Sequence, residues 1–486
     1  MSRFGFWSLG LLAWACLSSA SKCPPAIKID KKPQLFILTD ITNEPDDSMS
    51  LVRLLVHSDQ YNITPDAILN TTSVWNEVVG NLSTHSEGEY PTKEYLESIV
   101  TAGHPVYGTA VFNQTTLSTG ASRLIKVLDS LSEDELLHVH GWGGVNTLAE
   151  ALKHLRESRE QHEVSSLTSR LRVYTISDQD NAGPWIRLNF PQIPYIVSIH
   201  GFNQYSEATW VGMNSGTGSD LYLSSQNYSS KNFQIGPLGE KYPDIIYGME
   251  GDTPTFLHTM QNGVNGGPLD HPEWGGWGGR YSLVDPSRQT LVYANTEDSV
   301  VGSDNETYTT AQATIWRWRQ AYQDEMSARM QWTILSNYSL GSHPPVVSVN
   351  GSCGSQQVEF EVDPLQTVVL DGSATYDPDA GLPGHEDLEY KWWQYGEITS
   401  TMGGTTVPQL NFTLSDNGRV TSVKMPTAEA ACEAVEAQAN IGLGVQPVCQ
   451  EYHIIFEVKG SGRPFPIRRY KRVILKVQSP VAAEKR

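Results

Sequence analysis

An alternation of apolar and amphipathic segments constrains the fold of this chain of 486 residues more than any other feature. Between residues 34 and 340, short apolar runs such as QLFIL and LRVYTIS alternate with segments of helical period such as DDSMSLVRLLVHS and VNTLAEALKHLRESR. Strands that alternate with helices are typical of a parallel sheet covered on both faces. Strands that are apolar throughout fit such double burial. We therefore predict an α/β domain with an open, mostly parallel sheet and helices on both faces.

The pattern changes at two prolines in the segment GSHPPVVSVNG, residues 341–351. Beyond it, short alternating runs separated by turn residues predict a small all-β sandwich. We expect a signal peptide at residues 1–20, the α/β domain at 21–342 and the sandwich at 343–486. Within the first domain, DAILNTT (66–72) predicts a strand, and residues 309–330 predict one long helix.

Three side-chain placements are expected in the sandwich. Trp392 and Trp393 are neighbours on a predicted strand, so one should face the core while the other is exposed and able to stack on a glycan. The basic run RRYKR, residues 468–472, is typical of a solvated edge strand, where charge discourages edge pairing.

The N-terminal segment predicts secretion. Arg3 precedes the apolar run FGFWSLGLLAWACL and the small residues of LSSA, as in a cleavable secretory signal peptide. Frequent Asn-x-Ser/Thr sequons suit an extracellular glycoprotein. They occur at Asn62, Asn70, Asn81, Asn113, Asn227, Asn305, Asn337, Asn350 and Asn411.

Four cysteines remain once Cys16 leaves with the signal peptide, and they allow three pairings. We favour Cys432–Cys449, because a short loop closes most readily and stabilises by roughly 3 kcal/mol in the chain-entropy model. Cys23–Cys353 follows by elimination and would tie the N-terminus to the second domain. The alternative is two free, buried thiols.

The formal net charge of −20 limits the partners. Nucleic acids and anionic membranes are disfavoured, whereas a neutral or cationic ligand fits. After the signal peptide no apolar run is long enough to span a membrane. The oligomeric state is not determined by these features.

The stretch TDITNEPDDSMSLVRLL gathers polar side chains directly after the first apolar strand. In open α/β sheets, ligands bind beyond the carboxyl ends of the strands. Helix capping explains one or two of the carboxylates, a hard-cation site such as Ca²⁺ would use several, and a clamp on sugar hydroxyls would include a carboxylate base. The polar residues of this stretch are Asp40, Asn43, Glu44, Asp46 and Asp47.

Two further strand ends carry candidate substrate contacts. In HVHGWGGVNTLAEAL, a glycine-rich turn leads into a helix, where Asn146 is either a ligand contact or an N-cap and Trp142 is either a stacking platform or a core lid. In YTISDQDNAGPW, Asn181 follows a strand and is a candidate contact to sugar hydroxyls.

The segment MEGDTPTFLHTM brings two more carboxylates, Glu250 and Asp252. Downstream, Trp274 and Trp277 lie among glycines, which favours rings presented to sugar faces over buried core rings. Arg280 would bind a carboxylate of the ligand or pair with Glu250 or Asp252. Glycoside hydrolysis uses two carboxylates that flank the bond. We expect Asp46 or Asp47 on one side and Glu250 or Asp252 on the other.

LTDITNEPDD resembles the Asp-x-Asp-x-x-x-Asp-Asp signature of the nucleoside hydrolases. The resemblance implies that Asp40 and Asp47 bind one Ca²⁺ and that the cluster grips sugar hydroxyls and activates water. Asp40, Asp46 and Asp47 match three positions, but Thr42 stands where the family has its presumed general base. Glu44, two residues further on, is a candidate replacement.

A closer resemblance is to secreted cellulose-binding proteins that join a nucleoside-hydrolase-like domain to an immunoglobulin-like domain. TDITNEPDD, HGWGGVNTLAEAL and residues 249–281 carry it. It implies cellulose or another glycan as partner and an extracellular protein. The function that we favour is hydrolysis of glycosidic bonds in cell-wall glycans or their fragments. The alternatives are a non-catalytic glycan-binding protein with a degenerate pocket and, third, a nucleoside hydrolase.

Overall fold

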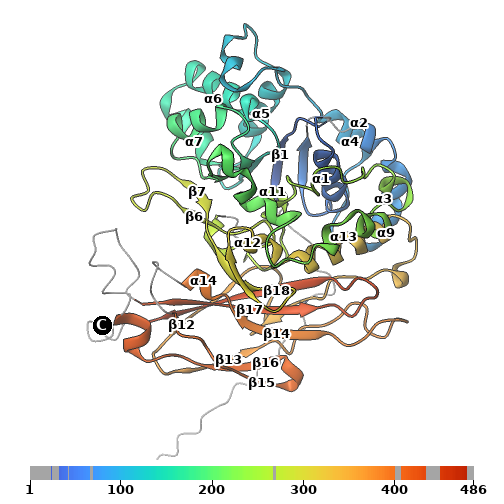
Figure 1. The fold of residues 1–486 in the computed structure, drawn as a ribbon, viewed down its shortest axis with the longest axis vertical. Helices are drawn as coiled ribbons and strands as arrows, with labels where there is room; N and C mark the ends of the chain where they lie inside the picture. The colour runs from blue at the N-terminus through green and yellow to red at the C-terminus, as the bar shows by residue number, and fades with distance from the viewer. Residues whose placement is uncertain are drawn as a thin grey trace, which may run out of the picture.

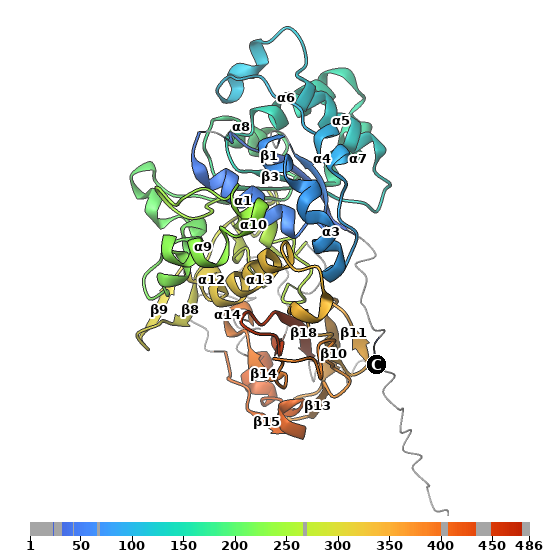
Figure 2. The same ribbon diagram turned by 90° about the vertical axis from the view of Figure 1, so that its right-hand side faces the viewer.

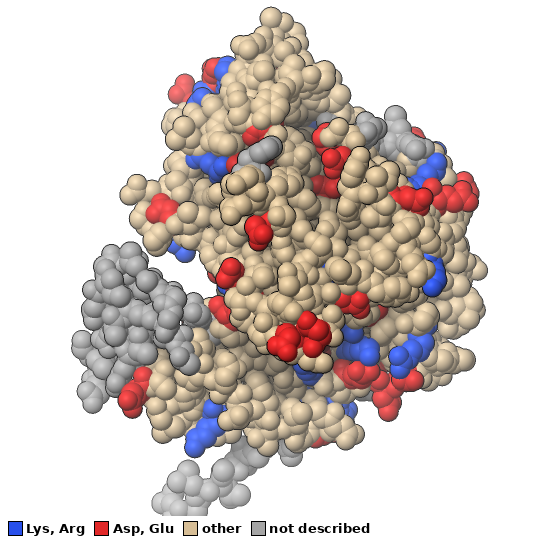
Figure 3. Space-filling model, viewed as in Figure 1, with Lys and Arg blue, Asp and Glu red and all other residues tan. Residues whose placement is uncertain are grey.

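The computed structural model describes residue 23 and residues 32–41, 43–65, 69–265, 270–399, 407–433 and 449–478. The expected signal peptide and Thr42 lie outside these ranges. The chain forms an α/β domain followed by a β-sandwich, which are stacked along the long axis in both views (Figure 1, Figure 2). On the face drawn in Figure 3, acidic and basic side chains are interspersed over both domains. Among the described helices, none is long and apolar enough to cross a membrane.

The predicted parallel sheet is confirmed. Among the described residues, seven strands pair in the order β2-β1-β3-β4-β5-β7-β6, and all pairs are parallel except β6 with β7. The strands are β1 (Gln34–Leu38), β2 (Asn62–Pro65), β3 (Leu137–Gly141), β4 (Leu171–Ser177), β5 (Tyr195–Ser198), β6 (Tyr281–Leu283) and β7 (Val292–Asn295). Parallel pairing brings the carboxyl ends of β1, β3, β4 and β5 to one edge of the sheet.

Helices cover both faces of this sheet, because neighbouring side chains of a strand point to opposite sides. Leu35 and Ile37 pack into a core with α1, α3 and α13, whereas Phe36 and Leu38 pack into another with α5, α6, α7 and α8. These helices are α1 (Pro45–Val56), α3 (Trp75–His85), α5 (Thr119–Ser130), α6 (Asn146–Ser158), α7 (Gln161–Ser169), α8 (Ala182–Asn189) and α13 (Arg319–Trp332).

Shorter helices connect these elements. The α-helical ones are α2 (Leu69–Thr72), α4 (Lys93–Ser98), α9 (Gln226–Asn232), α10 (Gly236–Gly239), α11 (Pro254–Leu257), α12 (Ala313–Trp316) and α14 (Gly396–Thr399). The 3₁₀ turns are η1 (Gly108–Asn113), η2 (Phe202–Glu207), η3 (Thr209–Met213), η4 (Tyr222–Ser224), η5 (Pro272–Trp274), η6 (Tyr338–Leu340) and η7 (Asp416–Gly418), and η8 (Glu429–Glu433) is a single π-helical turn.

Two local predictions are wrong. The strand expected at 66–72 lies earlier, as β2, and residues 69–72 form α2 instead. A short apolar run fits either state, and tertiary packing decides between them. The long helix expected at 309–330 is divided into α12 and α13, with Trp318 at the N-cap of α13.

The C-terminal part is the expected two-layer sandwich. Its sheets have the orders β12-β18-β17-β14 and β13-β16-β15, with β12 and β18 parallel. Two small hairpins, β8–β9 and β10–β11, flank the domains. The strands are β8 (Asp298–Val301), β9 (Thr307–Thr310), β10 (Ser348–Val349), β11 (Ser352–Cys353), β12 (Val358–Val362), β13 (Thr367–Asp371), β14 (Glu389–Gln394), β15 (Phe412–Ser415), β16 (Val420–Lys424), β17 (Glu451–Lys459) and β18 (Arg468–Val477).

The basic run at 468–472 is not a solvated edge, because β18 lies between β12 and β17 and faces the α/β domain. The guanidinium of Arg469 donates to Glu325 at 2.7 Å, and Arg329 also pairs with Glu325 at 3.0 Å. Arg472 donates through Nε to the carbonyl of Val264 at 2.7 Å. The positive charges therefore join the two domains instead of protecting an edge.

One of the two tryptophans, Trp392, faces the core as expected, but Trp393 is not the exposed ring that the sequence predicted. Trp392 is buried and stacks on Phe456 with ring centroids 4.1 Å apart. Trp393 is half-buried against Trp318 of the α/β domain, at a centroid distance of 5.8 Å. Both rings are used in packing, because the second sheet face is covered by the neighbouring domain.

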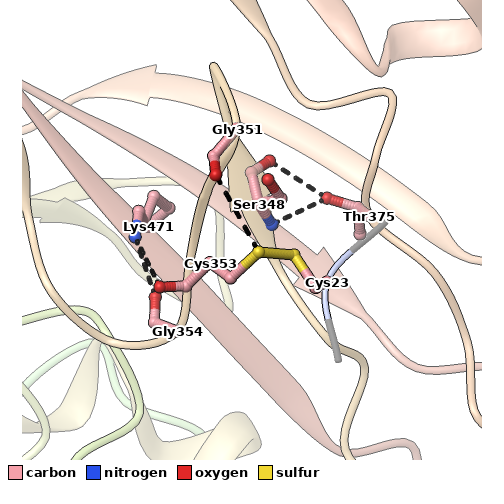
Figure 4. Close-up of a disulfide and its surroundings, with 7 residues drawn as sticks. All are labelled: Cys23, Ser348, Gly351, Cys353, Gly354, Thr375 and Lys471. Atoms are coloured by element: carbon pink, nitrogen blue, oxygen red, sulfur yellow. Dashed lines mark hydrogen bonds between the residues drawn. A yellow bond between two sulfur atoms is a disulfide. The ribbon is translucent and has the colours of Figure 1, made fainter. Parts of the chain in front are cut away.

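The structure contains both expected disulfides, Cys432–Cys449 and Cys23–Cys353. The second joins the N-terminal segment to β11, beside β18 (Figure 4). There, Nζ of Lys471 donates to the carbonyl of Gly354 at 3.0 Å.

Candidate functional site

Three aspartates meet beyond the carboxyl end of β1. Asp46 and Asp47 lie in the first turn of α1, which Pro45 begins, and Asp252 lies in the turn before α11. One carboxylate oxygen from each residue lies within 4.8 Å of the other two. Asp46 and Asp47, which follow the first strand, thus lie beside Asp252, a residue about two hundred positions away in the sequence.

Burial makes it costly to ionise the carboxyl groups of these aspartates. Asp47 is 3% exposed, and its carboxylate accepts a hydrogen bond from Thr39 Oγ1. Desolvation raises the pKa of Asp47 to about 8; the Thr39 hydrogen bond opposes this rise, and the charges of Asp40 and Asp46 add to it. Desolvation, followed by the charge of Glu44, also raises the pKa of Asp46.

Asp252 is the most constrained of the three. It is 1% exposed, and neither carboxylate oxygen has a hydrogen-bond partner among the described residues. Desolvation raises its pKa well above the ordinary range, and the charges of Asp47 and Asp46 raise it further. Carboxylates this close cannot all ionise unless a cation neutralises them.

The donor set fits a hard cation. Ca²⁺ takes six to eight oxygen ligands, including carboxylates that bind through one or both oxygens. Asp46, Asp47 and Asp252 supply three carboxylates, and Asp252 offers two oxygens without a partner among the described residues. The expected ligand Asp47 belongs to this group. Asp40 does not: it is exposed at the rim, where Asn43 Nδ2 approaches its carboxylate at 3.4 Å.

A pocket of about 220 Å³ opens beside the aspartates. Its lining includes the carboxylates Glu44 and Asp46 and the aromatic rings of Trp210 of η3 and Tyr247. Tyr247 is 83% exposed. Asp46 is therefore common to the carboxylate group and to the pocket wall. Aromatic rings beside carboxylates are typical of sites that hold hydroxylated rings, which stack on one face and form hydrogen bonds at their edges.

Trp210 is held in place by the last residue of β4 and by residues that follow β5. Its Nε1 donates to Ser177 Oγ at 3.0 Å, and Ser177 Oγ lies 3.1 Å from His200 Nε2. The ring of Tyr205 packs edge-on against both His200 and Trp210, at centroid distances of 5.1 and 5.5 Å. Such contacts fix the orientation of the indole before any ligand arrives.

Nothing predicted from the sequence pointed to Trp210, Tyr205 or Tyr247. The segment HGFNQYSEATW closely follows β5, so its position near the carboxyl end of a strand was the available signal. Tyr247 lies just before MEGD and could have been found by its proximity to that motif.

Glu250 does not join the carboxylate group as expected. It is fully buried and pairs with Arg53 of α1, whose Nη2 donates to it at 3.0 Å. Tyr242 OH and Thr253 Oγ1 also donate to it, at 2.7 and 2.9 Å. With its oxygens committed to these donors, Glu250 anchors the loop that carries Asp252.

Trp274, Trp277 and Arg280 lie at the domain boundary instead of in the crevice. Trp277 is 1% exposed and packs edge-on against Tyr470 of β18. Trp274 stacks on His271 at 3.9 Å and lies under the guanidinium of Arg472. Arg280 pairs with Asp298 at 2.6 Å, not with Glu250 or Asp252. The glycines here allow close approach of backbones: Gly278 lies against the backbone of His258.

The other three residues that we expected to contact the substrate form hydrogen bonds within the protein instead. Trp142 is a buried lid whose Nε1 donates to Thr255 Oγ1 at 2.8 Å, close to the Asp252 turn. Asn146 Nδ2 donates to the carbonyls of His104 and Val106, and Val145 is the N-cap residue of α6. Asn181 accepts a hydrogen bond from the Thr109 backbone at 2.8 Å. Both amides fix loops at the edge of the sheet.

Comparison with known proteins agrees with this architecture. Residues 34–281 match the family model described as "Cellulose-binding Sde182, nucleoside hydrolase-like domain", and residues 367–477 match "Cellulose-binding protein Sde0182, C-terminal domain". The chain belongs to this cellulose-binding family. Its family and its nucleoside-hydrolase-like fold were both expected from the sequence, and both are confirmed.

A solved structure shares the whole fold. It is a nucleoside hydrolase-related hypothetical protein from Saccharophagus degradans, described as associated with carbohydrate metabolism. The two are 28% identical, and the match covers 92% of this chain and 100% of that one, with a TM-score of 0.72. A second match, an endo-fucoidan hydrolase of glycoside hydrolase family 107, is 10% identical, covers 92% of this chain and 80% of that one, and has a TM-score of 0.17, too low to carry an argument. The search of curated proteins returned no match.

Proposed function

We propose that this protein is an extracellular hydrolase of glycosidic bonds in cell-wall glycans or their fragments, and that Asp46, Asp47 and Asp252 form its reactive centre. The observation that carries the proposal is the position of Asp46, which belongs both to the buried carboxylate group and to the aromatic pocket. A glycan bound in that pocket would place a hydroxyl or a glycosidic oxygen against the carboxylates. The cellulose-binding family supports a glycan as the ligand.

Asp46, Asp47 and Asp252 would hold a Ca²⁺ ion. When bound, such an ion supplies positive charge that attracts sugar hydroxyls and makes a water molecule more acidic. Thr39 orients the carboxylate of Asp47 through its hydrogen bond. Asp46 is the carboxylate that we assign as general base, because it is the member of the group that also lines the pocket. Glu44, which also lines the pocket, would bind the substrate or exchange the proton with solvent.

The carboxylate spacing favours this arrangement over the flanking pair expected from the sequence. Carboxyl groups of inverting glycosidases are separated by about 6.5–9.5 Å and those of retaining enzymes by about 5–5.5 Å. Here three carboxylates approach within 4.8 Å, and Glu250 is occupied by Arg53. The trio forms a cation-binding cup at one side of the pocket.

Trp210 would provide the stacking surface for the sugar next to the bond that is cleaved. Its indole is fixed by Ser177 and Tyr205, so little rotamer entropy is lost on binding. Secretion is proposed from the N-terminal segment, and the two disulfides fit an oxidising compartment.

The test is a release assay on the purified, secreted protein. A panel of cello-, xylo- and mixed-linkage oligosaccharides and of nucleosides would be incubated with Ca²⁺ or with chelator, and products identified by mass spectrometry. We expect sugar release from an oligosaccharide that is lost with chelator and in Asp47→Asn. Release from nucleosides alone would instead support a nucleoside hydrolase. Retention on cellulose with no release from any substrate would leave a binding protein.

A further inference from the structure

A larger hollow lies on the β-sandwich, far from the three aspartates. We call it the sandwich groove. Its volume is about 690 Å³, within the ~300–1,000 Å³ typical of small-ligand sites. The segment between β13 and β14, the strand β14 and the turn η7 form its walls, at the end of the molecule opposite to β1 (Figure 1, Figure 2). Its lining includes Tyr376, Asp377, Asp387, Tyr390, Asn417 and Arg419.

A rigid aromatic platform forms part of the groove. The ring of Tyr390 is half-buried and stacks on Phe456 with centroids 6.0 Å apart and an interplanar angle of 7°. Phe456 in turn stacks on Trp392 at 4.1 Å, inside the sandwich core. Tyr390 therefore stands at the end of a row of three nearly parallel rings on one face of the sheet. A platform fixed before binding loses little side-chain entropy when a ligand stacks on it.

A second tyrosine lines the groove from a different segment. The backbone of Tyr376 is bridged to Val346, with hydrogen bonds of 3.1 and 3.0 Å in the two directions. Its ring is half-buried at the groove wall. Two tyrosines from separate elements can contact successive units of an extended ligand, whereas a single ring would define only one position.

Two of the charged side chains at the groove are paired within the protein. Glu386 pairs with Arg463, and Arg419 donates to Asp416 at 2.6 Å. Asp377 accepts a hydrogen bond from Ser461. Asp377 and Asp387 form no ion pair with a described basic side chain, so the groove disfavours an anionic ligand, and its hydrogen-bonding groups suit a neutral one.

Two polar side chains are available for hydrogen bonds. Asp387 and Asn417 are exposed at the groove, and neither side chain forms a hydrogen bond with another described residue. A carboxylate accepts hydrogen bonds from hydroxyls, and an amide both donates and accepts them. Flat rings with such groups at their edges match the C–H face and the hydroxyl edge of a pyranose.

We propose that the sandwich groove is a second glycan-binding site, which holds a neutral oligosaccharide with Tyr390 and Tyr376 as stacking platforms. The proposal rests on the proposed function, since that names glycans as the ligand class. The groove would hold one stretch of a polysaccharide while another stretch enters the aspartate crevice. Neither family match assigns this role to particular residues.

The experiment measures binding with the crevice disabled. Titration calorimetry would use the full secreted chain carrying Asp47→Asn and Trp210→Ala, with cellohexaose, xylohexaose and laminarihexaose as separate probes. Tyr390→Ala and Tyr376→Ala are then added singly. Tyr390→Phe is the conservative variant, because it keeps the ring, and Tyr95→Ala on α4 is the control for removing an exposed tyrosine elsewhere. Thermal unfolding checks that each variant is folded.

We expect the background protein to bind at least one of the hexaoses. Tyr390→Ala and Tyr376→Ala should each weaken that binding by about tenfold, while Tyr390→Phe and Tyr95→Ala bind like the background. Folded alanine variants that bind as tightly as the background, or a background that binds none of the three sugars, would overturn the proposal. Loss of sugar release by the crevice does not affect this result, so failure of the hydrolase proposal is distinguishable from failure of the groove.

Discussion

Replacing Asp47 with Asn should stabilise the protein in chelator, increasingly so as the pH rises. The pKa of this buried carboxyl is about 8 in the fold, against about 3.9 in an unfolded chain. Between these values the native state keeps a proton that the unfolded state has released, so stability falls with increasing pH. At about 1.36 kcal/mol per pKa unit, the carboxyl reduces the free energy of unfolding by up to about 4 kcal/mol at pH 7. Asn removes this effect and can still accept from Thr39.

The assay is thermal unfolding of both proteins in EDTA at several pH values from 5 to 8. We expect the melting temperature of Asp47→Asn to exceed that of the wild type by an amount that grows across this range. Ca²⁺ should reverse the order, because it stabilises only the protein with the full carboxylate set. Asp129→Asn, which alters an exposed pair with Arg159, is the control and should show no such pH dependence. A wild-type protein whose stability relative to Asp47→Asn is constant or rises with pH would refute the reasoning.

Three other changes test the rest of the architecture. Arg469→Met leaves the buried Glu325 with one fewer partner, so it should lower the free energy of unfolding by roughly 3–5 kcal/mol in a denaturant titration. Arg159→Met, which removes a surface ion pair, is the control and should change little. Trp210→Ala should raise the KM for an oligosaccharide by about tenfold while the protein stays folded. Trp277→Ala removes a fully buried ring and should lower the free energy of unfolding by roughly 3–5 kcal/mol. Cys23→Ser should lower the free energy of unfolding by about 2–4 kcal/mol relative to the wild type under oxidising conditions, and this difference should vanish when both proteins are reduced.

Much of the fold follows from local patterns. The apolar run at 34–38 and the helix after Pro45 were predictable, because period and capping signals agree there. The run at 66–72 was misassigned, since its few apolar residues satisfy either a strand or a helix. The role of the basic run at 468–472 depended on long-range contacts: Glu325 is over a hundred residues away, and only the docked domains bring it near Arg469.

In the candidate site, too, some residues could be placed from the sequence and others could not. Asp46 and Asp47 could be placed at a sheet edge because they directly follow a strand. Glu250 and Asp252 looked equivalent in sequence, but one pairs with Arg53 while the other has no hydrogen-bond partner for its carboxylate among the described residues. Glycine-flanked Trp277 suggested exposure, yet the glycines serve close backbone packing and the ring is buried. Such differences depend on partners distant in sequence, which no local pattern specifies.

The most direct test of the central claim is cleavage of an oligosaccharide in ¹⁸O-labelled water with Ca²⁺ present. If Asp46, Asp47 and Asp252 form a hydrolytic centre, the label should enter the newly formed reducing end, and Asp252→Asn should abolish the labelled product while the protein stays folded. Asp178→Asn, which alters a carboxylate paired with Arg187 at the same sheet edge, should leave the product unchanged. Absence of labelled product from the wild type, or equal product from Asp252→Asn, would contradict the account.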